Sequence, residues 1–130
     1  TYSELARARG VALTCAAEDR EAHFDPEQMR RAVENLVINA IEAAPAGSTV
    51  SLAARHDAGN LILSVHDQGS GPPAEIRDHV FEPFVTGRAE GTGLGLSIVR
   101  EIADAHGGTA RLGQAQAGTV FEIVVPCRPS

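Results

Sequence analysis

The strongest hydrophobic pattern in the chain lies in residues 25–45, DPEQMRRAVENLVINAIEAAP. Asp25 and Pro26 suit the N-cap and the first position of a helix, and Gln28 completes the pattern of a capping box. Pro45 and Gly47 are expected to end this helix. Its apolar residues recur at spacings of three and four, which predicts one buried stripe: Met29, Val33, Leu36, Val37, Ala40, Ile41 and Ala44.

The other hydrophobic runs predict five strands and two further helices. Strands are expected at residues 10–17, 48–56, 60–67, 109–114 and 119–126, and helices at residues 73–81 and 94–108. The order β-α-β-β-α-α-β-β predicts an α/β two-layer sandwich, in which helices cover one face of a mixed, mostly antiparallel sheet. Residues 1–9 are expected to be the end of an upstream linker or helix, and residues 10–130 a single domain.

Composition narrows the classes of partner. The formal net charge of −6 argues against a nucleic-acid surface, and a bound polyanion would need backbone N–H groups or a metal ion. The chain has no apolar run of about 18 residues and no signal-peptide pattern, so we expect no direct membrane contact. A cytoplasmic location is expected, whether or not the parent protein is membrane-anchored. Cys15 and Cys127 lie in apolar runs without metal-ligand spacing, which favours buried, reduced thiols.

The stretch EGTGLGLS, residues 90–97, is the first candidate for chemistry. Its three glycines directly precede a predicted helix, and a helix N-terminus offers unpaired N–H groups and partial positive charge to an anion. A P-loop is excluded because the chain contains no lysine. A dinucleotide-binding fingerprint fits poorly, because the third glycine comes one residue early and no strand precedes the loop. A plain surface loop is the remaining alternative.

Two other polar groups accompany this loop. Asp67 ends an apolar strand and opens DQGSG, so its carboxylate would lie at the rim of the sheet and need a donor such as the amine of a base. Asn35, Asn39 and Glu42 are spaced to form a polar stripe beside the apolar stripe of the long helix. An amide oxygen there would suit Mg²⁺, with phosphates and waters completing its shell. A tight turn and a solvated helix face are the bland alternatives.

Together these segments resemble one family. NLVINAIEAAP, DQGSG, FEPF and GTGLGLSIV resemble, in this order, the N, G1, F and G2 boxes of the sensor histidine kinases. The resemblance covers about residues 10–126 and implies the Bergerat fold of the wider GHKL ATPases. Many relatives carry a basic and an aromatic residue at the positions of Glu42 and Ala43. The chain therefore looks like the nitrogen-regulator-type branch, where small and polar residues occur.

The resemblance implies a role for each matching residue that would face the base and the metal ion. Asn39 would ligate Mg²⁺, and Asn35 would lie near the metal and its waters. Asp67 would accept a hydrogen bond from the adenine amine of ATP. Gly69 and Gly71 would flank the base, and the absence of Cβ atoms would let the backbone approach it.

The resemblance also implies a lid and a phosphate-binding loop. Phe81 and Phe84 would anchor the lid, which would span residues 85–92. Arg88 falls where many relatives carry a lysine that reaches the γ-phosphate, and with Asn35 and Asn39 it would be catalytic. The phosphates would be held by Gly91, Thr92, Gly93, Leu94, Gly95, Leu96 and Ser97.

The implied function is to bind Mg·ATP and donate its γ-phosphate to a histidine on a separate dimerisation domain of a two-component sensor kinase. A response regulator would be reached through the full-length protein. None of the five histidines precedes a glutamate, which is common at the acceptor of this family. We therefore expect the acceptor to lie outside this chain, and the isolated chain to be nearly inactive.

Two alternative functions stay open. The first is an ATPase clamp of the gyrase type, which places a general-base glutamate where this chain has Asn35. Glu34 is the neighbouring acid, but it lies about 100° away around the helix. The second is a serine kinase of the anti-sigma type. The compact lid and GTGLGLSIV fit a sensor kinase better.

Overall fold

The structure is a computed structural model that describes residues 7–8, 10, 12–17, 25–72, 74–82, 95–113 and 117–126. Its elements are β1 (Ala12–Ala17), α2 (Pro26–Ala43), β2 (Thr49–Asp57), β3 (Asn60–Asp67), the 3₁₀ helix η1 (Ala74–His79), α3 (Gly95–Ala105), β4 (Thr109–Leu112) and β5 (Thr119–Pro126). The predicted order of elements is confirmed. In these ranges no helix is long and apolar enough to cross a membrane.

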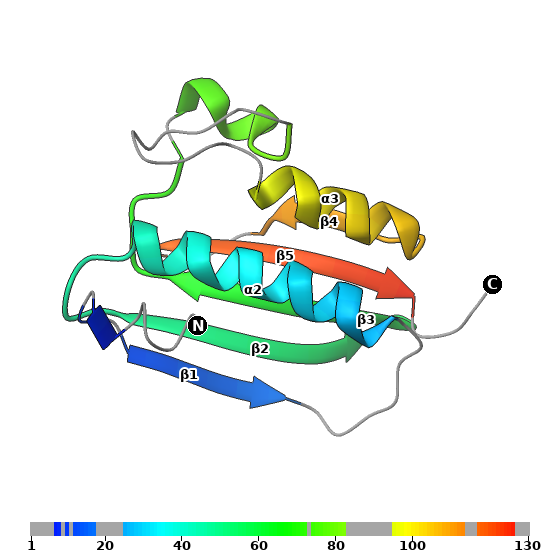
Figure 1. Cartoon of the computed structure of the whole chain (residues 1–130), viewed down its shortest axis with the longest axis horizontal. Helices are drawn as coiled ribbons and strands as arrows, with labels where there is room; N and C mark the ends of the chain where they lie inside the picture. Colours follow the sequence, from blue (N-terminus) through cyan, green and yellow to red (C-terminus); the bar gives the residue numbers. More distant parts are fainter. Residues whose placement is uncertain are drawn as a thin grey trace.

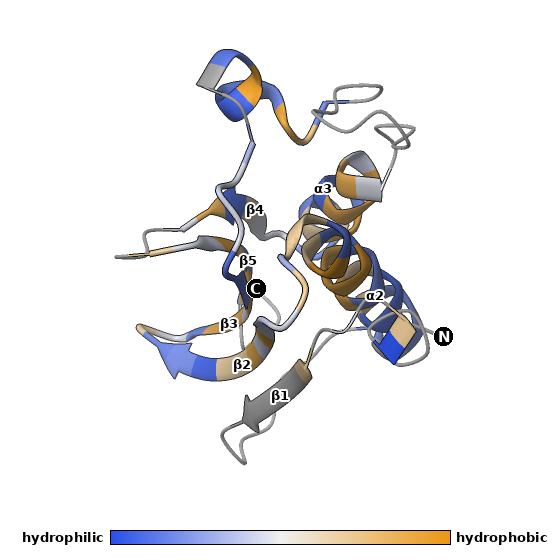
Figure 2. Cartoon of the chain, turned by 90° about the vertical axis from the view of Figure 1, so that its left-hand side faces the viewer, coloured by the Kyte–Doolittle hydropathy of each residue, from blue (hydrophilic) through white to orange (hydrophobic). Residues whose placement is uncertain are grey.

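The strands described form one sheet in the order β1-β2-β3-β5-β4 (Figure 1). β1 pairs in parallel with β2, and the other three pairings are antiparallel. Helices α2 and α3 lie together on one face of the sheet (Figure 2). The predicted two-layer α/β sandwich, with a mixed, mostly antiparallel sheet, is therefore confirmed.

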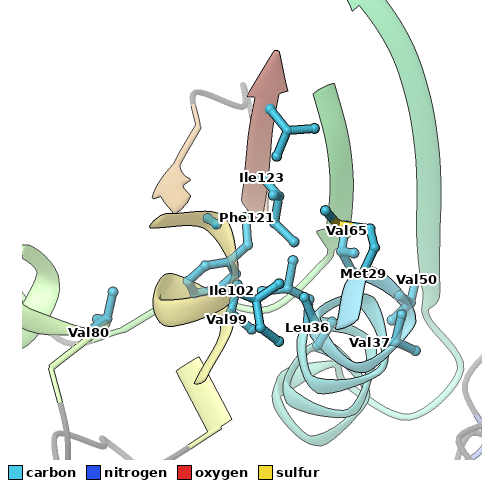
Figure 3. Packing of buried hydrophobic residues seen from close by; sticks show 14 of the residues in the cluster. Met29, Leu36, Val37, Val50, Val65, Val80, Val99, Ile102, Phe121 and Ile123 are labelled. Carbon is cyan, nitrogen blue, oxygen red and sulfur yellow. The ribbon is translucent and has the colours of Figure 1, made fainter. Parts of the chain in front are cut away.

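The core lies between that face and the two helices (Figure 3). From α2 it takes most of the predicted apolar stripe, including Leu36, Val37 and Ile41, each at most 1% exposed. Val99 from α3 and Ile123 from β5 meet this stripe. Because burying such a side chain contributes about 1.5–3 kcal/mol, the stripe fixes which face of α2 is turned to the sheet. The polar residues of α2 lie beside this stripe, where the helix surface is half-buried.

Two expected helix boundaries differ in detail from the structure. Helix α2 ends at Ala43, and Ala44 is extended, with φ −75° and ψ 139°. The following Pro45 disfavours helical backbone at the residue before it, which accounts for the early end. The segment expected as a short helix at 73–81 forms a 3₁₀ helix of six residues, too short to propagate as an α-helix.

The start of α2 corrects the predicted capping box. The Asp25 carboxylate accepts hydrogen bonds from the backbone N–H groups of Glu27 and Gln28, at 3.0 and 3.1 Å, as an N-cap should. The return bond from Gln28 to the Asp25 backbone is replaced, because the Asp25 N–H donates to Nε2 of His106 at 3.0 Å. Distant contacts therefore decide how this cap is completed.

His106 joins the two helices at the far end of the sandwich. Its Nδ1 donates to the carbonyl of Ile102 in the last turn of α3, at 2.8 Å. Its Nε2 at the same time accepts from Asp25 at the start of α2. The start of α2 thus meets the end of α3, and the helices run antiparallel (Figure 1). The C-terminal half of α2 and the N-terminus of α3 consequently share the other end.

Substitution of His106 tests this link. We expect His106→Ala to lower the free energy of unfolding by about 2 kcal/mol, because two hydrogen bonds of about 1 kcal/mol each are lost. His106→Asn should lose about half as much, since its amide can still donate to Ile102 but is too short to reach Asp25. Urea denaturation measures both values.

Arg100→Ala serves as the control, because Arg100 makes only an exposed pair with Asp104 at 4.0 Å. That change should stay within about 0.5 kcal/mol of the wild type. Equal stability of His106→Asn and the wild type would show that the bond to Asp25 contributes nothing.

Candidate functional site

The ends of three elements lie toward the same end of the sandwich (Figure 1). They are the C-terminal end of α2, the end of β3 at Asp67, and the start of α3 at Gly95. Each carries one of the polar groups that the sequence singled out. The fold therefore brings together the amides of α2, the DQGSG turn and a helix N-terminus.

Asp67 is the most unusual side chain at this end. It is 1% exposed, and its Oδ1 accepts a hydrogen bond from the Gly69 backbone N–H at 2.7 Å. Its Oδ2 is buried and has no hydrogen-bond partner among the residues that the structure describes. Burial raises the pKa of this carboxyl above its ordinary value, while the Gly69 N–H and the nearby His66 act in the opposite direction. A buried carboxylate with one orphaned oxygen is a site that a donor would stabilise.

The two glycines of the turn are required by the protein's own packing. A Cβ atom at Gly69 would lie 2.6 Å from the carbonyl oxygen of Ala43, so the turn presses directly against the end of α2. Gly71 has φ +82°, a left-handed conformation, and a Cβ there would lie 2.7 Å from the hydroxyl of Thr119. These contacts explain both glycines without a bound ring, and their expected place beside a base stays a prediction.

Thr119 is a residue of this site that the sequence did not reveal. It is 7% exposed and stands opposite Asp67 in the pairing of β3 with β5. Its hydroxyl donates to the carbonyl of Gly69 at 3.3 Å. The only signal in the sequence is a threonine at the head of a mostly apolar strand, and the sequence does not indicate which residue it will face. The register of the sheet supplies that information.

The polar stripe of α2 forms as expected. Asn35, Asn39 and Glu42 are all half-buried, beside the fully buried Leu36 and Ile41. Asn39 and Glu42 also engage in interactions with the protein. Within the described ranges no group of three or more His, Cys, Asp or Glu residues could hold a metal ion. A cation bound at Asn39 would therefore need ligands from a substrate and from water.

The start of α3 supplies backbone donors to the same end. Gly95 is the first residue of this helix of 11 residues, and its first turn contains no acidic side chain. Leu96 is half-buried and Ser97 is 7% exposed. The first N–H groups of a helix have no partners inside the helix, and groups at this position can bind an anion.

The remaining predicted residues lie outside the described part of the chain. They are Phe84, Arg88, Gly91, Thr92, Gly93 and Leu94, together with Cys127. Phe81 is described: its ring packs edge-on against that of Phe121 in β5, with centroids 5.9 Å apart. Phe81 is therefore held against the core by this ring contact.

Comparison with known proteins gives one consistent result. The family of histidine kinase-, DNA gyrase B-, and HSP90-like ATPases matches residues 24–129. The sensor histidine kinase ZraS of Escherichia coli is 35% identical over 127 residues, which cover 95% of this chain and 27% of that protein. The sensory histidine kinase/phosphatase NtrB of Rhodobacter capsulatus is 38% identical over 118 residues, covering 81% of this chain and 33% of NtrB.

A solved structure agrees. The catalytic domain of histidine kinase ThkA, in a nucleotide-free form, superposes with a TM-score of 0.84 at 31% identity, covering 97% of this chain and 85% of that one. The chain spans about a quarter to a third of the length of the two curated relatives named here. Similarity to NtrB agrees with the expected resemblance to the nitrogen-regulator-type branch.

Replacing Asp67 tests the cost of its buried carboxylate. Its pKa is raised in the folded state, so ionisation costs the folded protein stability as pH rises from the ordinary value of 3.8 through the folded value. We expect Asp67→Asn to remove this pH-dependent loss and to leave the domain at least as stable as the wild type near neutral pH. Urea denaturation from about pH 4 to pH 8 measures the difference.

Asp57→Asn provides the control, because Asp57 is an exposed carboxylate at the end of β2. Its pH profile should follow that of the wild type. If the Asp67→Asn profile also ran parallel to the wild type, burial would impose no cost on the Asp67 carboxylate.

Proposed function

We propose a function from one premise: this chain belongs to the family of histidine kinase-, DNA gyrase B-, and HSP90-like ATPases, and within it resembles the catalytic domains of sensor histidine kinases. The chain binds Mg·ATP and presents the γ-phosphate to a histidine on a separate dimerisation domain. The parent protein then passes the phosphoryl group to a response regulator in a two-component pathway.

The orphaned oxygen of Asp67 carries the proposal. Adenine offers an exocyclic N–H to an acceptor, whereas guanine has a carbonyl at the equivalent place, which would face the carboxylate as a second acceptor. Because Oδ2 is buried and lacks a partner, a hydrogen bond from adenine would satisfy a group that the folded protein leaves unsatisfied. The Asp67 carboxylate therefore favours ATP over GTP.

The helix ends supply the groups for the triphosphate. The N-terminus of α3, from Gly95 to Ser97, provides N–H donors and a favourable dipole, and Asn39 on α2 provides an amide oxygen. This donor set fits Mg²⁺, which prefers oxygen ligands and usually keeps several waters and phosphate oxygens in its shell. When bound, Mg²⁺ would neutralise charge on the phosphates.

The chemistry asks little of this chain beyond positioning. In the transfer, a bond from an imidazole nitrogen to the γ-phosphorus forms as the bond from that phosphorus to the ADP oxygen breaks. The chain holds the nucleotide in line and stabilises charge, and the attacking nitrogen comes from the acceptor domain. Arg88, outside the described residues, is proposed to contact the γ-phosphate.

The histidines described here are all engaged in structural contacts. His66 bonds to Ala117, His79 contacts Glu82, His106 joins the two helices, and His56 interacts within the protein near the end of β2. These engagements agree with an acceptor located on another domain.

The ATPase clamp is less well supported by the geometry. Such an enzyme needs a carboxylate to activate water, and position 35 carries an amide. The neighbouring Glu34 lies on the outer surface, 44% exposed, with its carboxylate 3.9 Å from Arg30. It therefore points into a surface pair rather than toward the DQGSG end.

Two matched substitutions separate base recognition from metal binding. Asp67→Asn should weaken ATP binding at least tenfold and narrow the preference for ATP over GTP, because a buried polar contact discriminates strongly. Asn39→Ala should keep the preference for ATP but lose the gain in affinity that Mg²⁺ provides. Calorimetric titration of each variant with ATP and GTP, with and without Mg²⁺, measures both effects.

Each variant is the control for the other, since each should retain the property that the other loses. Wild-type affinity and selectivity in Asp67→Asn would refute adenine recognition by this carboxylate. An unchanged magnesium effect in Asn39→Ala would assign the metal to other residues.

The transfer step is tested with γ-labelled ATP. We expect the chain alone to hydrolyse ATP very slowly and to remain unlabelled, because it lacks an acceptor histidine and a base at position 35. Adding the histidine-bearing dimerisation domain of the same protein should give acid-labile phosphohistidine on that domain. Rapid hydrolysis by the chain alone would support the clamp, and stable phosphoserine on another protein would support the serine kinase.

A further inference from the structure

We infer that His66 is a positioning residue for the proposed base-binding site. It ties Ala117, just before β5, to the end of β3 and thereby holds Thr119 in place. The inference rests on the proposed function, because it concerns how the ATP site is kept in shape. His66 is the residue before Asp67 in β3. Successive side chains of a strand point to opposite faces, so His66 lies on the face of the sheet away from the helices.

The contact made by His66 is specific. Its Nε2 lies 2.8 Å from the carbonyl oxygen of Ala117, which can only accept, so Nε2 carries the hydrogen. Ala117 stands just before Gly118 and the first residue of β5, Thr119. The bond therefore fixes the chain two residues before the threonine that faces Asp67.

Gly118, just before β5, packs directly against the end of β3. A Cβ atom at Gly118 would collide with the backbone oxygen of Asp67 and would lie 2.9 Å from Nε2 of His66. On the helix side of the sheet, the Thr119 hydroxyl donates to the Gly69 carbonyl. Thr119 at the start of β5 thus contacts the DQGSG turn on the helix side of the sheet. His66 bonds to Ala117 on the other face.

The other side of the turn is held independently. The Gln68 side-chain oxygen accepts a hydrogen bond from the Thr49 backbone at 2.9 Å, which ties the turn to the start of β2. His66, Asp67 and Gln68 therefore contact three different parts of the chain. Gln68 keeps the DQGSG turn attached to β2. Loss of the His66 bond should therefore loosen Thr119 without unfolding the DQGSG turn.

Charge supports the same assignment. His66 lowers the pKa of the Asp67 carboxyl, against the larger effect of burial. It therefore favours the ionised carboxylate, which is the stronger acceptor for an adenine amine. Its main contribution is nevertheless the bond to Ala117, which a neutral side chain can reproduce.

The test compares two amide side chains of different reach. His66→Gln places an N–H donor near the position of Nε2 and should bind ATP within about twofold of the wild type. His66→Asn is too short and should bind ATP about fivefold more weakly, the loss expected for one hydrogen bond. Affinity for inorganic tripolyphosphate should be unchanged in both, because it lacks the base. Isothermal titration of the whole chain measures each value.

A double-mutant cycle with Thr119→Val shows whether His66 acts through the threonine. If it does, His66→Asn should cost much less affinity in the Thr119→Val background than in the wild type. Additive losses, or an equal loss for tripolyphosphate and ATP, would overturn the inference, as would wild-type affinity in His66→Asn.

Failure of the proposed function would look different. In that case the wild-type chain itself would show no preference for ATP that depends on Asp67. Thr119→Val alone tests whether the threonine matters for base selectivity, and an unchanged ATP/GTP ratio in that variant would also overturn the role given to His66.

Discussion

The half-satisfied carboxylate of Asp67 is the interaction on which the rest of the site depends. One oxygen accepts a hydrogen bond from its own turn, and the other is buried with no partner in the described part of the chain. A folded protein gains no stability from such an oxygen, so the surrounding structure must hold the group in place against its cost. The close packing of Gly69 against α2 and of Gly71 against Thr119 does this. The carboxylate is thus kept ready for a donor.

The fold brings the groups proposed to bind phosphate to the same end of the sheet by a simple geometric rule. Antiparallel helices on one sheet face put the C-terminal half of α2 beside the N-terminus of α3, and β3 ends under both (Figure 1). The hydrogen bond from the Asp25 N–H to His106 holds the two helices in this register at their far ends. The amide proposed to bind the metal ion on one helix and the backbone donors of the other therefore lie toward the same end of the sandwich.

The hydrophobic pattern was sufficient to predict every element and the two layers, because burial of the α2 stripe and the strand alternation are local properties. It also drew attention to Asp67 and Asn39, which interrupt apolar segments and whose roles stay predictions. It could not predict Thr119 or the completion of the Asp25 cap by His106. Both depend on pairings between residues far apart in sequence, which periodicity does not encode. By local sequence the Gln28 side chain was a reasonable acceptor for the Asp25 backbone N–H. In the structure that N–H donates to the imidazole of the distant His106.

The two halves of the site rest on different supports, and this affects what each can contribute. The proposed base recognition rests on Asp67 and Thr119, which stand opposite each other on two inner strands whose side chains are mostly buried. The proposed phosphate binding rests on a helix N-terminus and a half-buried amide at the edge of the core. Rigid support suits discrimination between bases, because an acceptor that cannot shift penalises the wrong partner. The proposed transfer to another domain needs a phosphate end that a partner can reach, and a site built from the ends of helices suits that need better than one in the middle of the sheet.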